Sequence, residues 1–543
     1  MKLKSKKSAL LMSFTSLLLC FAMLAGSTFA WFTDTAATGV NQIKSGTLDV
    51  GLEMKNPDYD PEVEGSKEWI NAEGKTLEFV KAAGAAENEA VLWEPGCTYE
   101  LPELRIVNKG NLALKYKVEF TGIRGDAKLN EVITWTIVEG AEANAIKEND
   151  VATGEYFLLP AGETTAPLTI KGEMDKNAGN EYQNLTIDGI GITVFATQYT
   201  YENDSIDNTY DEDAAYAQGA YIVGLTDENG KTVTFDTLTA AAKAWRESKD
   251  IVTSGGNMGQ HPAELTSVDT ISWIISGKVN SGDGTGVNGS SGNLLSGGYI
   301  YPRIEIKNIY VKGVNNAELK NEIVTPSSDA LSAAAKNVVY DGITFPEYMC
   351  FNTQAENVTF KNCTFKGGLK VMQAVNVTVD NCKIEGDGTK DYAFFAQGNS
   401  LKKIDFKNNT VSGFMRGINV QAGNDAVVTI DGNTITNITG MTKNDKTYGA
   451  AIQLTSAKTF TITNNTISDV AVNALHIWAG TTDKCNPDSI VIKNNTISAA
   501  YLCWNEANYD MSKVTSSGNT VNVTNADQCV TKTEVKDSSF TLN

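Results

Sequence analysis

Polar and apolar residues alternate along several stretches in the first half of the chain. In LALKYKVEF (112–120) every second residue is apolar from Leu114 onward, and the residues between them are Lys or Glu. This period of two predicts a β-strand with one buried face and one face in water. ELRIV (103–107) and IGITVFATQYTYE (190–202) predict two more strands, and NKGN (108–111) predicts the turn into the 112–120 strand.

Strands of this kind favour an antiparallel β-sandwich, which we place at residues 31–210. Residues 55–92 are charged and rich in Gly and Ala, so we expect them to be a surface insertion. Residues 211–231 are expected to be a linker to a second domain, 232–543.

A repeat of nine residues fills the second domain. Its copies are NVVYDGITF, NVTFKNCTF, NVTVDNCKI, KIDFKNNTV, VVTIDGNTI, TFTITNNTI, SIVIKNNTI and KVTSSGNTV, which begin at residues 337, 357, 376, 403, 427, 459, 489 and 513. Apolar residues recur at the second, fourth and ninth positions, which predicts short strands with inward-pointing side chains. The sixth position is always Gly or Asn, the residues that tolerate left-handed φ, so a sharp bend is expected there.

The seventh position of the repeat becomes Asn in the later copies. Stacked asparagines can hydrogen-bond from one strand to the next, because each side chain carries both a donor and an acceptor. We therefore expect a structural ladder at Asn409, Asn433, Asn465, Asn495 and Asn519.

This repeat, over residues 300–525, resembles a right-handed parallel β-helix similar to those of the pectate-lyase-like superfamily. Such solenoids need capped ends. FDTLTAAAKAW (235–245) has Phe235, Leu238, Ala242 and Trp245 at helical spacing, which predicts an N-terminal cap helix at about 235–249.

The N-terminus is typical of a secretory signal. Lysines in MKLKSKK are followed by the uncharged, mostly apolar residues 8–25, and small residues come next, so we place the signal peptide at 1–30 with cleavage between Ala30 and Trp31. An uncleaved signal anchor is the alternative, because 18 apolar residues just span a bilayer. After cleavage we expect no stable membrane insertion.

Several motifs of the first domain resemble the TasA/camelysin family. They are STFAWFTD, SGTLDV, EPGCTYELPELRIVNKGNLALKYKVEF and VFATQ, in this order. The resemblance implies a jelly-roll-like sandwich exported through a SipW-type signal peptidase of a Gram-positive-type bacterium. It also implies a secreted cell-surface or extracellular biofilm-matrix protein. Its Trp31 and Phe32 would begin a donor strand that adds to a neighbouring copy of itself or to a related TasA-like subunit.

Charge and residue usage exclude several functions. The 543 residues carry a formal net charge of -20, which argues against nucleic acid as a partner. The family has also been labelled a metalloprotease, but that chemistry on a helix needs HExxH. The chain has two histidines, His261 and His476, far apart in sequence. We therefore predict no cofactor and no metal site.

One face of the expected β-helix carries candidate chemistry. GINVQ (417–421), AIQLT (451–455), ALHIW (474–478) and YLCWN (501–505) align as strands of successive rungs. Their outward residues and a flanking arginine form a candidate glycan-binding stripe, because indole rings stack on sugars: Arg416, Asn419, Gln453, His476, Trp478 and Asn505. The alternative is an ordinary polar solenoid face, since outward polar residues are the default for an alternating strand.

Taken together, the patterns predict an all-β chain with a jelly-roll-like sandwich followed by a right-handed parallel β-helix with a short cap helix. The expected function is structural: assembly through the N-terminal strand, with the β-helix displayed as a candidate polysaccharide binder. A glycan-binding adhesin that does not polymerise is one alternative. A tethered polysaccharide lyase or hydrolase is another, but we assign no catalytic residue, because no recurrent Asp or Glu column follows the rungs.

Overall fold

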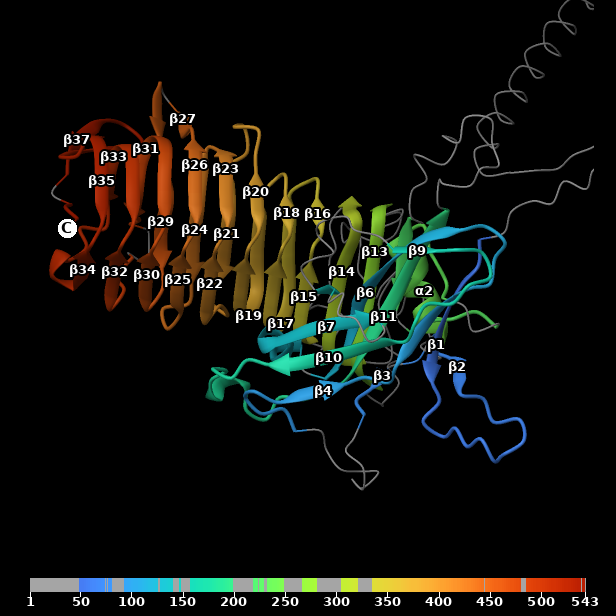
Figure 1. Cartoon of the computed structure of the whole chain (residues 1–543). Helices are drawn as coiled ribbons and strands as arrows, with labels where there is room; N and C mark the ends of the chain where they lie inside the picture. Colours follow the sequence, from blue (N-terminus) through green and yellow to red (C-terminus); the bar gives the residue numbers. More distant parts are fainter. Residues whose placement is uncertain are drawn as a thin grey trace, which may run out of the picture.

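The computed structural model describes a sandwich of two antiparallel sheets and a long parallel β-helix (Figure 1). The described residues are 48–73, 75, 77–80, 92–125, 127–139, 146–147, 157–198, 218–222, 224–228, 232–248, 266–280, 304–320, 335–443, 445–479, 485–538 and 540–542. The signal peptide, Ala30, Trp31 and Phe32 lie outside them. Among the described residues, no helix has the length and hydropathy needed to cross a bilayer.

Two sheets form the sandwich. The first has the order β2 (Trp69–Asn71), β1 (Val50–Lys55), β5 (Leu104–Asn108), β10 (Leu168–Met174), β7 (Ile133–Glu139) and β8 (Ile146–Lys147), with β4 (Thr98–Glu100) also on β10. The second has the order β3 (Leu77–Glu78), β11 (Ile187–Gln198), β6 (Leu114–Gly125) and β9 (Phe157–Leu159). The apolar alternation of β6 faces the core between the sheets, where Leu114, Tyr116 and Val118 are buried. The 3₁₀ helices η1 (Ala127–Val132) and η3 (Asn180–Tyr182) belong to the same domain.

The turn at 108–111 joins the two sheets of the sandwich. β5 and β6 belong to different sheets, so this turn carries the chain from one sheet to the other. The buried amide of Asn108 holds this crossover, because it donates to the carbonyls of Leu112, Leu159 and Pro160. These bonds fix the crossover locally, and the sequence pattern shows only the turn.

The expected surface insertion at 55–92 is wrong in part. It contains β2 and β3, one strand for each sheet, and its residues Ala72, Leu77 and Phe79 are buried in the core. Phe79 stacks on Trp135 with ring centroids 5.9 Å apart. The sequence pattern does not reveal this short buried segment, because most residues around it are charged or small.

The β-helix runs from residue 266 to residue 525. Its strands are β13 (Thr266–Asn280), β14 (Ile304–Lys320), β15 (Ala335–Asp341), β16 (Thr344–Phe345), β17 (Met349–Lys361), β18 (Thr364–Phe365), β19 (Leu369–Asp380), β20 (Lys383–Glu385), β21 (Tyr392–Gly398), β22 (Lys403–Lys407), β23 (Thr410–Phe414), β24 (Arg416–Ala422), β25 (Val427–Asp431), β26 (Thr434–Ile438), β29 (Ala450–Ser456), β30 (Thr459–Thr463), β31 (Thr466–Ile477), β32 (Ser489–Lys493), β33 (Thr496–Asn505), β34 (Val514–Ser517) and β35 (Thr520–Asn525). Each strand pairs in parallel with its counterpart one rung further, and 3₁₀ helix η4 (Met511–Lys513) precedes β34.

The repeat positions explain this stacking. The fourth-position rings of Tyr340 and Phe360 stack with centroids 5.1 Å apart, and the ninth-position rings of Phe345 and Phe365 stack at 5.0 Å. The sixth-position asparagines, such as Asn362 with a φ of 55°, adopt the left-handed conformation. The fourth and ninth positions of successive rungs thus fill one continuous core, and the sixth positions turn the chain at the same corner of each rung.

The five seventh-position asparagines form a hydrogen-bonded ladder. The side-chain oxygen of Asn465 accepts from the backbone N–H and the amide of Asn433, each at 2.9 Å. The Asn465 amide donates to Asn495 Oδ1 and to the Ile430 carbonyl. The same pattern joins Asn409 to Asn433 and Asn495 to Asn519, so the ladder satisfies backbone groups at the inner corner of successive rungs.

A second asparagine ladder, which the sequence analysis missed, occupies the first position of the repeat. Asn337 donates to Asn308, Asn357 to Asn337, and Asn376 to Asn357, at 2.8–2.9 Å. The signal was present as the N that opens three copies of the repeat. The pattern does not continue along the repeat, because Lys, Val, Thr or Ser takes this position in the later copies.

The fifth position of the repeat alternates in charge. Strand register places Lys312, Asp341, Lys361, Asp380, Lys407 and Asp431 next to one another in this order along the rod. Asp341 is almost fully buried, with Lys312 Nζ at 3.2 Å and Lys361 Nζ at 3.4 Å. We call these six residues the charge column.

Two elements lie at the N-terminal end of the β-helix. β12 (Gly219–Ile222) pairs antiparallel with β13, so the stretch expected to be a linker, 211–231, contributes a strand to the sheet. The helix α2 (Leu238–Ser248) follows, and its Leu238, Ala241 and Trp245 are buried in the core that also contains the first rungs.

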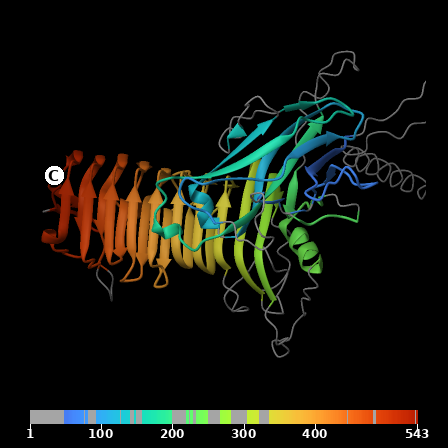
Figure 2. The ribbon, with the colours of Figure 1, turned by 60° about the horizontal axis from the view of Figure 1, so that its bottom comes forward.

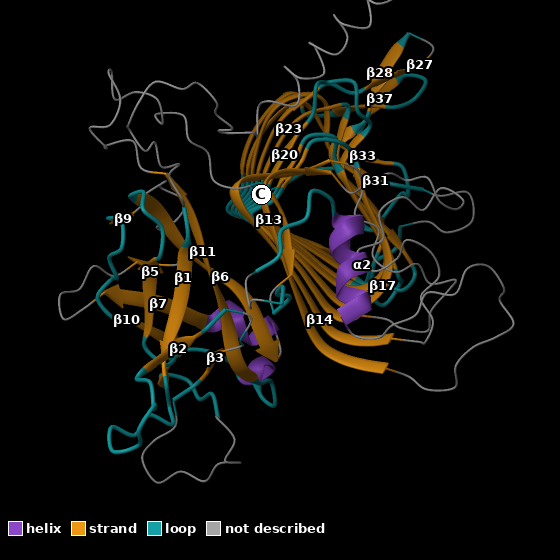
Figure 3. Cartoon of the chain, turned by 90° about the vertical axis from the view of Figure 1, so that its right-hand side faces the viewer, coloured by secondary structure: helices purple, strands orange, loops and turns teal. Residues whose placement is uncertain are grey.

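The sandwich lies along the side of the first rungs, and the later rungs extend beyond it (Figures 1 and 2). β6 contacts β13 and β14, and the end-on view shows the two units side by side (Figure 3). Tyr310 and Val339, on the outer face of the β-helix, are buried in the core of the sandwich. The two units therefore share an apolar interface.

Candidate functional site

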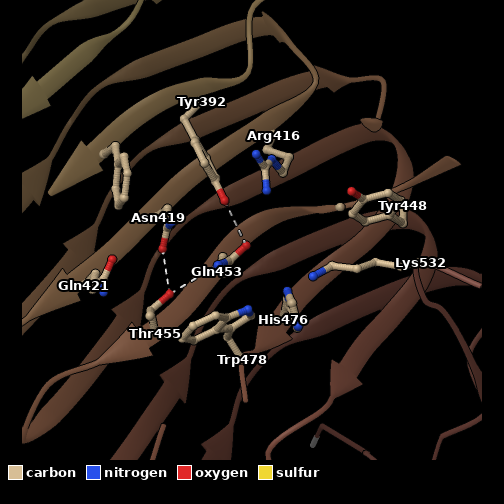
Figure 4. Close-up of a pocket in the computed structure, with 12 residues that line it drawn as sticks. Tyr392, Arg416, Asn419, Gln421, Tyr448, Gln453, Thr455, His476, Trp478 and Lys532 are labelled. Atoms are coloured by element: carbon tan, nitrogen blue, oxygen red, sulfur yellow. Dashed lines mark hydrogen bonds between the residues drawn. The ribbon is translucent and has the colours of Figure 1, made fainter. Parts of the chain in front are cut away.

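A cavity of about 330 Å³ opens on the β-helix beyond the sandwich (Figure 4). Its walls combine amides, hydroxyls, aromatic rings and two cations. They are formed by Tyr392, Phe395, Arg416, Asn419, Gln421, Tyr448, Gly449, Gln453, Thr455, His476, Trp478 and Lys532. Five of the six residues of the sequence-predicted stripe thus meet here, and Asn505 is the exception.

One column of side chains forms the floor. Parallel register aligns Phe395 of β21, Asn419 of β24, Gln453 of β29 and His476 of β31 on successive rungs. Asn419, Gln453 and His476 are only 4%, 7% and 3% exposed. The stripe is therefore the lining of a hollow and not an open polar face.

The amides of the floor are held by their neighbours. Thr455 donates to Asn419 Oδ1 at 2.8 Å, and Gln453 donates to Thr455 at 3.2 Å. The Tyr392 hydroxyl donates to Gln453 Oε1 at 3.3 Å, and burial raises the pKa of Tyr392 to about 12, so this hydroxyl keeps its proton. A network of this kind fixes donors and acceptors in place before a ligand arrives.

Arg416 forms the wall next to this network. Its guanidinium is paired with Asp391 through both Nε and Nη2, and it lies over the Tyr392 ring at 3.8 Å from the centroid. A Cβ at Gly449, whose φ is +144°, would come within 3.0 Å of Arg416 Cγ. Glycine is therefore required where the chain passes the arginine.

His476 is buried between neighbours from two directions. Its Nε2 lies 3.0 Å from Glu506 Oε2, and its ring stacks on Trp504. Burial lowers the pKa of His476, although the hydrogen bond with Glu506 opposes that shift. The imidazole is accordingly neutral at neutral pH, with Nε2–H donating to the carboxylate.

The expected place of Asn505 is wrong. The sequence alignment set Cys503 and Asn505 beside His476 and Trp478, but the structure pairs His476 with Trp504 and Ile477 with Asn505. Two irregularities in the β31–β33 pairing, before Val470 and before Asn473, each change the register by one residue, and the pairing that results at the site differs by one residue from the expected alignment. A shift of one exchanges the two faces of a strand, so Cys503 is buried in the core and Asn505 binds the backbone of Tyr509.

The walls contain residues that sequence reasoning missed. Tyr392 and Phe395 come from β21, in the sequence DYAFFAQ, which carries no copy of the nine-residue repeat. Tyr448 comes from the hairpin of β27 (Met441–Lys443) and β28 (Lys446–Tyr448), and Lys532 follows β36 (Gln528–Val530), which pairs with β37 (Val535–Asp537). The aromatic residues of β21 were the one available signal. Nothing in the sequence marks the two hairpins as walls.

The chemistry open to the cavity depends on which ionisable groups line it. Hydrolysis of a glycosidic bond needs two carboxyl groups about 5–9 Å apart across the substrate. Among the described residues that line the cavity there is no Asp or Glu. The described residues also contain no group of three or more His, Cys, Asp or Glu that could hold a metal ion.

Comparisons with known proteins bear on the fold. Residues 259–484 match a family model described as a right handed beta helix region, so the C-terminal part of the chain contains a right-handed β-helix. No curated protein matches the sequence. Among solved structures, the catalytic domain of a GH87 alpha-1,3-glucanase in complex with nigerose aligns at 12% identity with a TM-score of 0.20, covering 79% of this chain and 89% of that one. At that TM-score its activity says nothing about this chain, and the resemblance to the TasA/camelysin family stays a prediction.

Proposed function

We propose that the β-helix binds a carbohydrate in this cavity and that the protein works by binding and display, not by catalysis. The single observation that carries the proposal is the lining: a pre-formed amide and hydroxyl network beside the rings of Tyr392, Phe395, Tyr448 and Trp478. Sugars present apolar ring faces and many hydroxyl groups. Such a ligand suits a concave site with a few fixed polar groups.

A glycan array with the mature protein, followed by calorimetry on each ligand found, tests this proposal. Trp478→Ala should weaken binding about tenfold or more, because the lining loses an aromatic face. Tyr348→Ala is the matched control, since Tyr348 is an aromatic residue of the β-helix, 45% exposed, that does not line the cavity. Failure of every glycan to bind, or equal binding by Trp478→Ala and wild type, would contradict the proposal.

The alternative of a polysaccharide lyase or hydrolase has its own readout. Each ligand found is incubated with the protein, and new reducing ends and unsaturated products are measured. We expect neither, because no carboxylate pair lines the cavity. Product formation that Trp478→Ala abolishes would establish the enzymatic alternative.

We also propose that the chain is a secreted surface or matrix protein that assembles through residues 31–45. The support is the sequence resemblance together with a hollow of about 320 Å³ beside β11. Among the described strands, β3 pairs with β11 only at Gly189 and Ile190, and residues 192–196 line the hollow consecutively. The hollow is also lined by residues of β1 and β12, and Phe195 packs against Tyr221 there. We expect an extended segment of another copy to add beside β11 at this hollow.

Deletion of residues 31–45 tests the assembly. The full mature chain should form fibres under the electron microscope, and the truncated chain should not. N-terminal sequencing of secreted protein should begin at Trp31. Fibres from the truncated chain would exclude strand addition and leave the glycan proposal untouched.

Two finer features of the fold belong to the same proposal. We propose that the sandwich is jelly-roll-like and that α2 caps the N-terminal end of the β-helix. The buried Leu238 and Trp245 of α2 lie in the same core as the first rungs, which supports the capping role. Trp245→Ala should therefore expose the end of the solenoid and promote aggregation, measured by light scattering.

A further inference from the structure

The hairpin β36–β37 packs on the last rungs, next to the cavity. β36 contacts β33 and β31, and the Ser538 hydroxyl just after β37 donates to the Cys503 carbonyl at 2.9 Å. The hairpin is thus attached to the β-helix at both of its ends.

Asn473 fixes the hairpin relative to the cavity. Its side chain is fully buried; its amide donates to the Val530 carbonyl at 2.8 Å, and its oxygen accepts from the Val530 N–H at 3.1 Å. The same amide donates to the Gly449 carbonyl at 2.9 Å. One side chain on β31 therefore holds two walls of the cavity, Gly449 and the strand that leads to Lys532.

The turn of the hairpin is also held. The buried Thr531 hydroxyl accepts from the N–H groups of Thr533 and Glu534 and donates to the Glu534 carbonyl. Lys532 follows Thr531 directly, and its side chain extends toward His476 (Figure 4). The turn thus fixes the backbone from which the exposed Lys532 side chain extends.

The charges of the cavity are opposite to those of the protein as a whole. The chain has 65 acidic and 45 basic side chains, but the lining contains Arg416 and Lys532 and no acid. Asp391 neutralises Arg416, whereas no described carboxylate forms an ion pair with Lys532. Glu506 accepts from His476 and from the Ala479 N–H and does not line the cavity. Lys532 therefore forms no ion pair in the described part of the chain, and its charge interacts with Glu506 only from beyond ion-pair distance.

We propose that the hairpin β36–β37 is the specificity element of the site, with Lys532 binding a carboxylate of an acidic sugar and Asn473 as the positioning residue. This inference rests on the proposed carbohydrate binding. An ammonium that forms no ion pair at the edge of a pocket gains from a ligand that brings a carboxylate within contact distance.

Matched pairs of ligands test the inference. The probes are trimers of galacturonate, glucuronate and mannuronate, each with its neutral methyl ester, titrated into the full mature chain. Wild type should bind at least one acid about tenfold more tightly than its ester. Lys532→Met should lose the preference and bind acid and ester about equally. Lys536→Met, on the same hairpin but outside the lining, should keep the wild-type preference.

Asn473 needs a readout that a general loss of structure would not produce. Asn473→Ala should lower the preference for acid over ester while the affinity for the ester stays within about threefold. Thr531→Val, which removes the turn bonds with nearly the same shape, should act in the same direction and serves if Asn473→Ala does not fold. A parallel loss of both affinities would overturn the positioning role.

The outcomes separate the two proposals. If none of the probes and no glycan of the array binds, the carbohydrate site itself is wrong. If glycans bind but acid and ester bind equally, or if only neutral sugars bind, the inference about Lys532 is wrong and the proposed function stands. Retention of the acid preference by Lys532→Met also contradicts the inference.

Discussion

The imidazole of His476 lies flat on the indole of Trp504, with ring centroids 4.1 Å apart and planes only 2° from parallel. The two residues are register partners on neighbouring rungs, β31 and β33. Trp504 is 4% exposed, and its indole N–H has no hydrogen-bond partner among the described residues. The indole thus supports the floor of the cavity from the next rung by its ring face.

Removal of that ring should weaken both the fold and the site. Trp504→Ala is expected to cost about 3–5 kcal/mol of unfolding free energy, because it leaves a buried cavity. It should also weaken glycan binding, since His476 loses the surface on which it lies. Thermal unfolding and calorimetry measure the two effects. Trp504→Phe is the control: it keeps a ring face and removes an N–H that has no described partner, so it should cost clearly less. Equal losses for the two variants would contradict a role in stacking.

Substitution in the seventh-position asparagine ladder should lower the free energy of unfolding far more than substitution at the neighbouring sixth-position bend. Asn465→Ala removes the side-chain bonds to the Ile430 carbonyl and to Asn495 Oδ1, and it takes the acceptor away from the Asn433 N–H and amide, so we expect a loss of about 2–5 kcal/mol in denaturant unfolding. Asn464→Gly is the matched control, because Asn464 is exposed with a φ of 56°, a conformation that glycine adopts freely. A small effect of Asn465→Ala would show that water replaces the ladder.

The stability that the charge column contributes should depend mainly on Asp341, its buried member. Asp341→Asn leaves Lys312 and Lys361 facing an uncharged amide, and loss of one partner in a buried ion cluster costs about 3–5 kcal/mol. Asp425→Asn removes the exposed pair with Lys402 and should cost at most about 1 kcal/mol. Chemical unfolding of both variants against wild type measures the difference. Similar losses would mean that the Asp341 cluster is not buried in solution.

His476 should make stability depend on pH. Burial lowers its pKa in the folded protein, so the unfolded chain takes up the proton first as the pH falls below about 6.5. This contribution to stability is complete above that pH and is lost on acidification. Unfolding midpoints should therefore fall more for wild type than for His476→Gln between about pH 7 and about pH 5.5. Parallel curves for the two proteins would contradict the shift, and an NMR titration of the two histidines provides a direct check.

The repeat positions explain why the β-helix could be predicted from sequence. Each rung places the same residue type at the same corner, so Phe360, Asn465 and Asn494 could be assigned to core, ladder and bend without a structure. The sandwich strands β6 and β11 were visible for the same reason, as alternating runs. Residues 77–79 were not, because two buried side chains among charged and small neighbours make too short a pattern.

The residues of the site could be predicted from sequence only where the spacing between successive rungs is regular. Asn419, Gln453 and His476 were aligned correctly because no irregularity interrupts their column between β24 and β31 at these positions. Asn505 was misplaced because β31 and β33 change register before they reach the site. Lys532 was missed because a hairpin that folds back on earlier rungs is a long-range contact, and local spacing does not report such contacts.

The charge column has a consequence for how the chain reaches this fold. Its rungs are so similar that a growing solenoid could accept a strand out of order with little change in apolar packing. If one rung were skipped, Asp341 would lie beside Asp380, or Lys361 beside Lys407, because strands two apart carry the same sign. Like charges at neighbouring positions in a sheet are destabilising. The alternation thus disfavours the omission of a single rung during folding, because that error places like charges beside one another.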